Sequence, residues 1–156
     1  MKQEQDDKIK SLDEMCQALL VEGATLASLS GISNEELERV YARGYESYQA
    51  GHYGEALVDF TYLVMHQPWD RRFHMALGSA LHQEGEYQSA LKFYGYALFM
   101  NACDPGPSYA IAQCLLALGE EADAREALQT AIEQSYTDPQ YHTIGVMAQE
   151  LLQKIL

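Results

Sequence analysis

The sequence predicts an all-α solenoid of three helix-turn-helix repeats, with a helical extension before them and a capping helix after them. The first observation behind this prediction is a period of 34 residues that keeps small residues in register. Four columns share the period: Gly51, Gly85 and Gly119; Ala56, Ala90 and Ala124; Gly44, Gly78 and Ala112; and Leu63, Ala97 and Ala131. The second observation is that both flanking segments place apolar residues three or four apart, which is typical of one face of an amphipathic helix.

Residues 1–36 form the N-terminal extension. Its apolar stripe lies opposite a polar face and consists of Ile9, Leu12, Met15, Leu19 and Leu20. Such a stripe must either fold back on the solenoid or pair with a second chain, so these residues are candidates for a homodimer contact. After Gly23 a short segment follows, and Ser33 with Glu36 predicts a capping box that opens the first repeat.

Residues 37–138 hold the repeats, with boundaries at 37–70, 71–104 and 105–138. Each repeat is interpreted as two antiparallel helices. The Gly51 column ends the first helix, where a positive φ is cheap only without a Cβ. The Gly44 column marks the place where the second helix crosses closely. The third repeat departs most from the pattern, as the terminal repeat of a solenoid often does.

Residues 139–156 predict a helix that caps the third repeat. Asp138 followed by Pro139 is typical of a helix N-cap and first turn. An apolar stripe then continues to the end of the chain through Ile144, Met147, Ala148, Leu151, Leu152 and Ile155.

Composition excludes several classes of function. The chain has 156 residues, with ten Lys or Arg, 23 Asp or Glu and a formal net charge of −13. That charge argues against binding nucleic acid or anionic lipid, and 47% apolar residues are too many for a disordered acidic chain. No apolar run is long enough for a membrane span or has the form of a signal peptide, so a cytoplasmic protein is expected. Three scattered cysteines without a CxxC spacing suggest reduced thiols.

Enzyme chemistry has no support in the sequence. There is no HExxH, GxSxG, phosphate-binding loop or Cys/His pairing, and the five histidines lack a metal-ligand spacing. We therefore expect no catalysis, no metal and no cofactor.

A tyrosine stripe is the strongest candidate for a binding surface. In a solenoid of this kind the first helices line the inner face, and Tyr41, Tyr45 and Tyr48 are spaced four and three apart. The stripe either packs under the N-terminal helix or forms a groove for a peptide. Tyrosine suits a groove because it offers apolar area, few rotatable bonds and a hydroxyl. His82 and Tyr109 occupy further inner positions in the second and third repeats.

The four columns resemble the tetratricopeptide repeat. Beyond this, the chain from about residue 10 to about residue 152 resembles the class II chaperones of bacterial type III secretion, the family of SycD/LcrH, PcrH and IpgC. The residues that carry this likeness are GATL at 23–26, VYARGYESYQAGHYGEA at 40–56, YGYA at 94–97, and QCLL at 113–116 followed by Gly119. The stretches LVMHQPW and AREALQTAIEQSY are similar to the SscB branch of the family.

The resemblance implies a cytoplasmic, non-catalytic chaperone. Its partner would be a hydrophobic, membrane-destined secreted protein, either a translocator or an effector, held by an extended segment in the groove. Cargo contacts are implied at Tyr41, Tyr45, Tyr48, Tyr53, His66 and Tyr94, and dimerisation through the N-terminal helix is implied as well. The alternative is a tetratricopeptide-repeat adaptor or co-regulator that has no secreted cargo.

Overall fold

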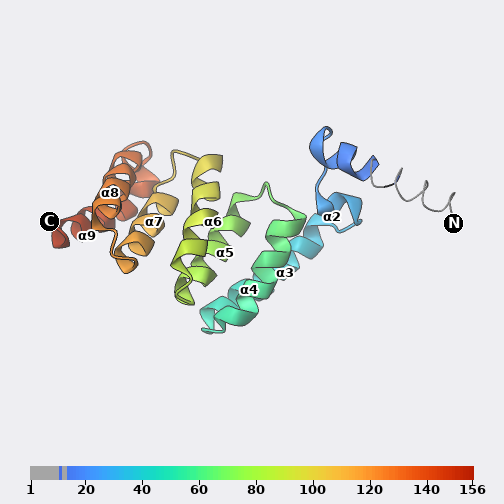
Figure 1. The fold of residues 1–156 in the computed structure, drawn as a ribbon, viewed down its shortest axis with the longest axis horizontal. Helices are drawn as coiled ribbons and strands as arrows, with labels where there is room; N and C mark the ends of the chain where they lie inside the picture. Colours follow the sequence, from blue (N-terminus) through green and yellow to red (C-terminus); the bar gives the residue numbers. More distant parts are fainter. Residues whose placement is uncertain (1–10, 12–13) are drawn as a thin grey trace.

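The computed structural model describes residue 11 and residues 14–156, and its helices stack one after another along the longest axis (Figure 1). Three antiparallel pairs make up the solenoid: α3 (Asn34–Gln49) with α4 (Tyr53–His66), α5 (Arg71–Gln83) with α6 (Tyr87–Met100), and α7 (Pro105–Ala117) with α8 (Glu121–Ser135). The short α2 (Leu26–Leu29) precedes them, and a 3₁₀ turn (Pro139–Tyr141) and α9 (His142–Lys154) follow. The predicted all-α solenoid of helical pairs is confirmed.

Glycine ends the first helix of each pair, as the 34-residue period predicts. Gly51, Gly85 and Gly119 have φ values of 80°, 79° and 79°. A side chain is strained in this left-handed conformation, so the three turns keep one backbone geometry only while glycine stays in the column.

The second glycine column marks close helix crossings. A Cβ built on Gly44 would lie 2.7 Å from Cε1 of Phe60, and one on Gly78 would lie 2.9 Å from the ring of Tyr94. Both rings are buried. In the first two pairs the second helix therefore presses an aromatic ring against the backbone of the first helix. This contact fixes the position of α3 and α5, which carry the site on another face.

Helix starts follow two patterns. Ser33 and Glu36 form the predicted capping box, and the bond from the Ser33 backbone lowers the pKa of Glu36. Asp70, Asp104 and Asp138 each accept a hydrogen bond from the backbone N–H two residues later. One boundary differs from the prediction: Asp138 caps the 3₁₀ turn, and the terminal α-helix begins only at His142.

One of the three cysteines, Cys114, is buried. Cys114 is 0% exposed in α7, and burial raises the pKa of its thiol to about 11. It packs with Ala90 and Tyr94. A thiol with so high a pKa carries little thiolate at neutral pH, so Cys114 serves packing.

Candidate functional site

A groove of about 400 Å³ lies where the exposed sides of α3 and α5 meet. Its walls come from both helices, from one residue of α4 and from the residue that caps α7: Tyr41, Tyr45, Tyr48, Phe60, Arg71, Arg72, Met75, Ala76, Ser79 and Asp104. The predicted tyrosine stripe is therefore brought together in one cavity. We call this cavity the tyrosine groove.

The tyrosines form a continuous row. Ring centroids lie 6.0 Å apart for Tyr41 and Tyr45, 6.3 Å for Tyr45 and Tyr48, and 5.3 Å for Tyr48 and Tyr53. Tyr41 also rests against Phe73 of α5 at 5.6 Å. Tyr45 is 45% exposed, whereas its neighbours are half-buried. Mutual stacking holds the rings in place, so a ligand would meet a row that has already lost most of its rotational freedom.

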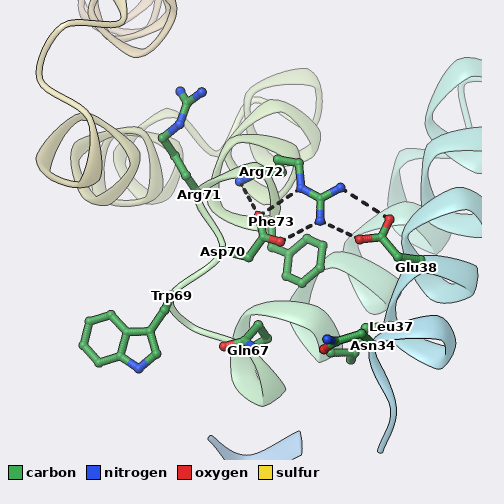
Figure 2. Close-up of a pocket in the computed structure, with 9 residues that line it drawn as sticks. All are labelled: Asn34, Leu37, Glu38, Gln67, Trp69, Asp70, Arg71, Arg72 and Phe73. Atoms are coloured by element: carbon green, nitrogen blue, oxygen red, sulfur yellow. Dashed lines mark hydrogen bonds and ion pairs between the residues drawn. The ribbon is translucent and has the colours of Figure 1, made fainter. Parts of the chain in front are cut away.

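One end of the groove carries an ion cluster built on Arg72 (Figure 2). The guanidinium of Arg72 donates to Glu38 of α3 and to Asp70 at the start of α5, with nitrogen–oxygen distances of 2.5 and 2.7 Å. Its central carbon also lies 5.4 Å from the ring centroids of both Tyr41 and Phe73. Arg72 thus ties the first repeat to the second and holds the face of Tyr41. We call this arrangement the Arg72 clasp.

The neighbouring arginine points the other way. Figure 2 shows Arg71 directed away from the clasp, and its guanidinium donates to Asp104, the cap of α7. Two consecutive arginines therefore join the second repeat to the repeats on either side of it. The groove lies between these two contacts.

Replacing Arg72 with methionine is expected to weaken ligand binding in the groove while changing the stability of the fold only slightly. The Arg72 and Glu38 side chains are 49% and 51% exposed, so losing their pair should lower the free energy of unfolding by no more than about 1 kcal/mol. Tyr41 would lose the cation over its face, so ligand binding in the groove should weaken several-fold. Urea unfolding and a binding assay would check both values. Arg39→Met, which removes an exposed pair with Glu35 on the same helix, is the matched control; equal binding by the two variants would contradict this role.

The tyrosine row of the groove is uncharged at neutral pH, and the charged residues of the wall, Arg71, Arg72 and Asp104, are held in ion pairs. Burial raises the pKa of Tyr41 and of Tyr48, although the Arg72 cation opposes part of the shift at Tyr41. Next to the groove on α5, burial lowers the pKa of His82, which favours its neutral imidazole. Such a surface offers apolar contact and neutral hydrogen-bonding groups, which suits a peptide segment with apolar side chains.

The other predicted cargo residues lie in different places. His82 is half-buried, with its ring centroid 5.6 Å from that of Tyr87. Tyr109 is on α7, packed against the core between α8 and α9. His66 ends α4, stacked on Tyr62 at 3.9 Å and bonded to the Tyr62 carbonyl. None of these three lines the tyrosine groove.

Tyr94 requires a correction. It was expected on the groove floor, but it is only 2% exposed and its ring lies against Gly78. A glycine on the facing helix lets the ring pass beneath α5, so it supports the floor from within the core. The sequence had given the Gly78 column as a close crossing, and that signal could have identified Tyr94 as the ring that fills it.

The N-terminal stripe is described only in part. Ile9 and Leu12 lie outside the described residues. Residues 14–20 are helical, and there Met15, Leu19 and Leu20 are 40%, 37% and 84% exposed. The described part of the predicted dimer contact therefore presents apolar side chains to solvent.

Two further observations bear on the class of protein. Within the part of the chain that the structure describes, no helix is both long and apolar enough to cross a membrane. Over the same residues, no group of three or more His, Cys, Asp or Glu side chains is placed to hold a metal ion.

The sequence is similar to tetratricopeptide-repeat profiles and to a protein of Yersinia. Two sequence profiles of the tetratricopeptide repeat match residues 41–107 and 81–150. The low calcium response locus protein H of Yersinia pseudotuberculosis is 31% identical over 139 residues, which cover 89% of this chain and 83% of that protein.

Solved structures agree with the sequence relatives. The type III secretion translocator chaperone SycD of Yersinia enterocolitica has a TM-score of 0.79 at 30% identity, covering 84% of this chain and 98% of SycD. PcrH in complex with the chaperone-binding region of PopD has a TM-score of 0.77 at 30% identity, covering 80% of this chain and 94% of PcrH.

Proposed function

The chain belongs to the class II chaperones of type III secretion, a family of tetratricopeptide-repeat proteins without catalytic activity, and on that premise we propose that it shields a hydrophobic secreted protein before export. The observation that carries the proposal is the row of Tyr41, Tyr45 and Tyr48, whose rings contact one another in the tyrosine groove. The complex of PcrH with the chaperone-binding region of PopD supports a cargo of the translocator class.

An extended segment of the cargo would lie along the tyrosine groove. Tyr41 and Tyr45 would form the walls of a pocket for a proline or leucine side chain, and Tyr48 and Tyr53 would continue the apolar surface. Ser79, which lines the groove, and His82, one helical turn beyond it on α5, would offer hydrogen bonds to the backbone of the segment, which otherwise has unpaired N–H and C=O groups. Tyr94 would act indirectly, by supporting α5 from below.

The work of the chaperone would take place in the bacterial cytoplasm. A membrane-destined cargo has apolar segments that aggregate when they are exposed, and covering them keeps the cargo soluble. The net charge of −13 adds repulsion between complexes, which favours their solubility. Release at export requires a moderate affinity, which an extended peptide in a narrow groove can supply. The likeness to the SscB branch keeps a membrane-targeted effector as the second class of cargo.

Co-expression tests this function. A secreted protein encoded beside the chaperone and insoluble on its own should appear in the soluble fraction when both chains are made together. The complex should survive purification and involve the tyrosine groove. If no membrane-destined secreted protein becomes soluble, the chain acts as a repeat adaptor and the proposal fails.

We also propose that two copies associate through the N-terminal region, because the stripe that includes Met15, Leu19 and Leu20 is apolar and exposed. Deleting residues 1–20 should therefore lower the mass seen by light scattering from that of a dimer to that of a monomer. Circular dichroism should show that the repeats remain folded. An unchanged mass would place the dimer contact elsewhere.

A further inference from the structure

A second hollow, of about 1090 Å³, lies between α6 and the connection from α4 to α5. Its wall consists of Pro68, Trp69, His74, Leu91, Lys92, Gly95, Tyr96, Phe99 and Met100. None of these residues lines the tyrosine groove. Trp69 lies away from the Arg72 clasp in Figure 2. We call this cavity the outer hollow, and the groove proposed for cargo does not account for it.

Large apolar side chains are exposed around the outer hollow. Trp69 is 71% exposed, Tyr96 54% and Phe99 89%. Together these three rings leave roughly 400 Å² of aromatic surface open to solvent. A contiguous patch of that size on a soluble protein often marks a contact with another molecule.

Acidic residues are absent from this surface. The chain has 23 Asp or Glu in 156 residues, yet none occurs at 60–69 or at 87–103, the segments that supply most of the wall. Lys92 is the one Lys or Arg on the wall, which has no Asp or Glu. An acidic partner that is repelled by the rest of the molecule can therefore approach here.

Gly95 leaves the backbone of α6 uncovered at the wall of the outer hollow. A Cβ on Gly95 would meet nothing within 4 Å, whereas Gly44, Gly78 and Gly145 are each pressed by a neighbouring side chain. Glycine inside a helix is less favourable than alanine, so packing within the chain gives no reason for glycine at this position. A bound partner that contacts the α6 backbone at this position would explain the glycine.

His74 is a buried polar side chain on the same wall. The side chain is 5% exposed, and its Nε2 lies 2.7 Å from the Pro68 carbonyl oxygen. That oxygen can only accept, so Nε2 carries the hydrogen. Nδ1 is buried and has no partner among the described residues. Nδ1 is closed off from solvent and so gives no contact to an occupant of the hollow.

The N-terminal stripe fits this surface. Residues 1–22 carry six Asp or Glu and three Lys, so the segment is acidic, and it is apolar along the stripe. Met15, Leu20 and Val21 are 40%, 84% and 77% exposed. Within one chain, Met15 borders α2 at the end of the stack, whereas α6 lies in the middle (Figure 1). Among the described residues, no part of the stripe lines the outer hollow of its own chain.

We propose that the outer hollow receives the N-terminal apolar stripe of a second copy of the chain. Each copy offers one stripe and one hollow, so a reciprocal exchange closes into a twofold dimer. This inference rests on the dimer proposed above and names its receiving surface.

The single tryptophan of the chain makes a direct test possible, because Trp69 is on the wall of the hollow. Sedimentation and Trp69 fluorescence would be followed together over a range of concentrations of the full chain. As the mass rises to that of a dimer, the emission should shift to the blue. A Cβ at position 95 meets nothing within 4 Å, so Gly95→Leu puts a side chain into the hollow and should weaken association at least about tenfold. Leu20→Glu changes the stripe instead and should weaken association as much. Gly54→Leu, at an equally open glycine of α4, is the matched control and should behave as the parent chain.

Three results would overturn the inference. The parent chain could remain a monomer, its Trp69 emission could stay constant while the dimer forms, or Gly95→Leu could associate as the parent does. Co-expression with cargo distinguishes failure of this inference from failure of the proposed function. The Gly95→Leu chain should keep cargo soluble as the parent chain does. A Gly95→Leu chain that still dimerises but loses its cargo would assign the hollow to cargo instead.

Discussion

Replacing Tyr41 and Tyr45 together with alanine is expected to abolish solubilisation of the cargo. Tyr45 is the exposed ring of the row and Tyr41 is its half-buried neighbour, and tyrosines at the centre of an interface commonly contribute about 2 kcal/mol each. Losing both should weaken binding by a factor on the order of 10²–10³. The measurement is the soluble fraction of co-expressed cargo, followed by titration of a synthetic cargo segment.

The control for this double variant must separate binding from stability. Tyr45 is 45% exposed, so Tyr45→Ala alone should cost little stability and still weaken cargo binding. Tyr136→Ala removes a 74% exposed tyrosine far along the solenoid and should change neither property. If the double variant kept cargo soluble while Tyr136→Ala did not, the tyrosine groove would not be the cargo site.

The repeat architecture could be predicted because certain backbone geometries require a small residue, which can then be recognised in the sequence. The Gly51 column requires a positive φ, and the Gly44 column requires a close crossing. Both requirements act at single positions and recur every 34 residues, so the sequence alone locates every turn and every helix pair. A long apolar residue does not indicate one backbone geometry, since it fits many environments.

The site could be predicted only where helical spacing decides which way a side chain points. Tyr41, Tyr45 and Tyr48 share one face of one helix, and the structure places them in one groove. The Arg72 clasp joins residues on different helices, and helical spacing within one element does not reveal such a contact. The outer hollow depends on the absence of a side chain at Gly95, which the sequence does not distinguish from a glycine required by packing.

Tyr94→Ala is expected to destabilise the fold severely, in contrast to Tyr45→Ala. Tyr94 is 2% exposed, and its ring fills the space above Gly78. Removing a buried aromatic ring costs about 3–5 kcal/mol of unfolding free energy, a large part of the stability of an ordinary domain. Urea unfolding of the purified variant would measure the loss, and cargo binding should fall only as the folded fraction falls.

Tyr94→Phe distinguishes support from direct contact. The Tyr94 hydroxyl lies 3.4 Å from Oγ of Ser79 and 3.5 Å from Nδ1 of His82, which are long distances for hydrogen bonds. Burial raises the pKa of Tyr94 well above its ordinary value, so this hydroxyl stays protonated. Losing such weak bonds should cost about 1 kcal/mol or less and should leave cargo affinity unchanged.

Alanine at Tyr45 and alanine at Tyr94 are therefore expected to have opposite effects on cargo affinity and on stability. At Tyr45, affinity should fall while stability holds, because the ring is open to the groove. At Tyr94, stability should fall while the affinity of the folded chain holds, because the ring supports α5 from below. A Tyr94→Phe chain that is fully folded but cannot bind cargo would show that the hydroxyl reaches the cargo, and the floor of the groove would then have to open when cargo binds.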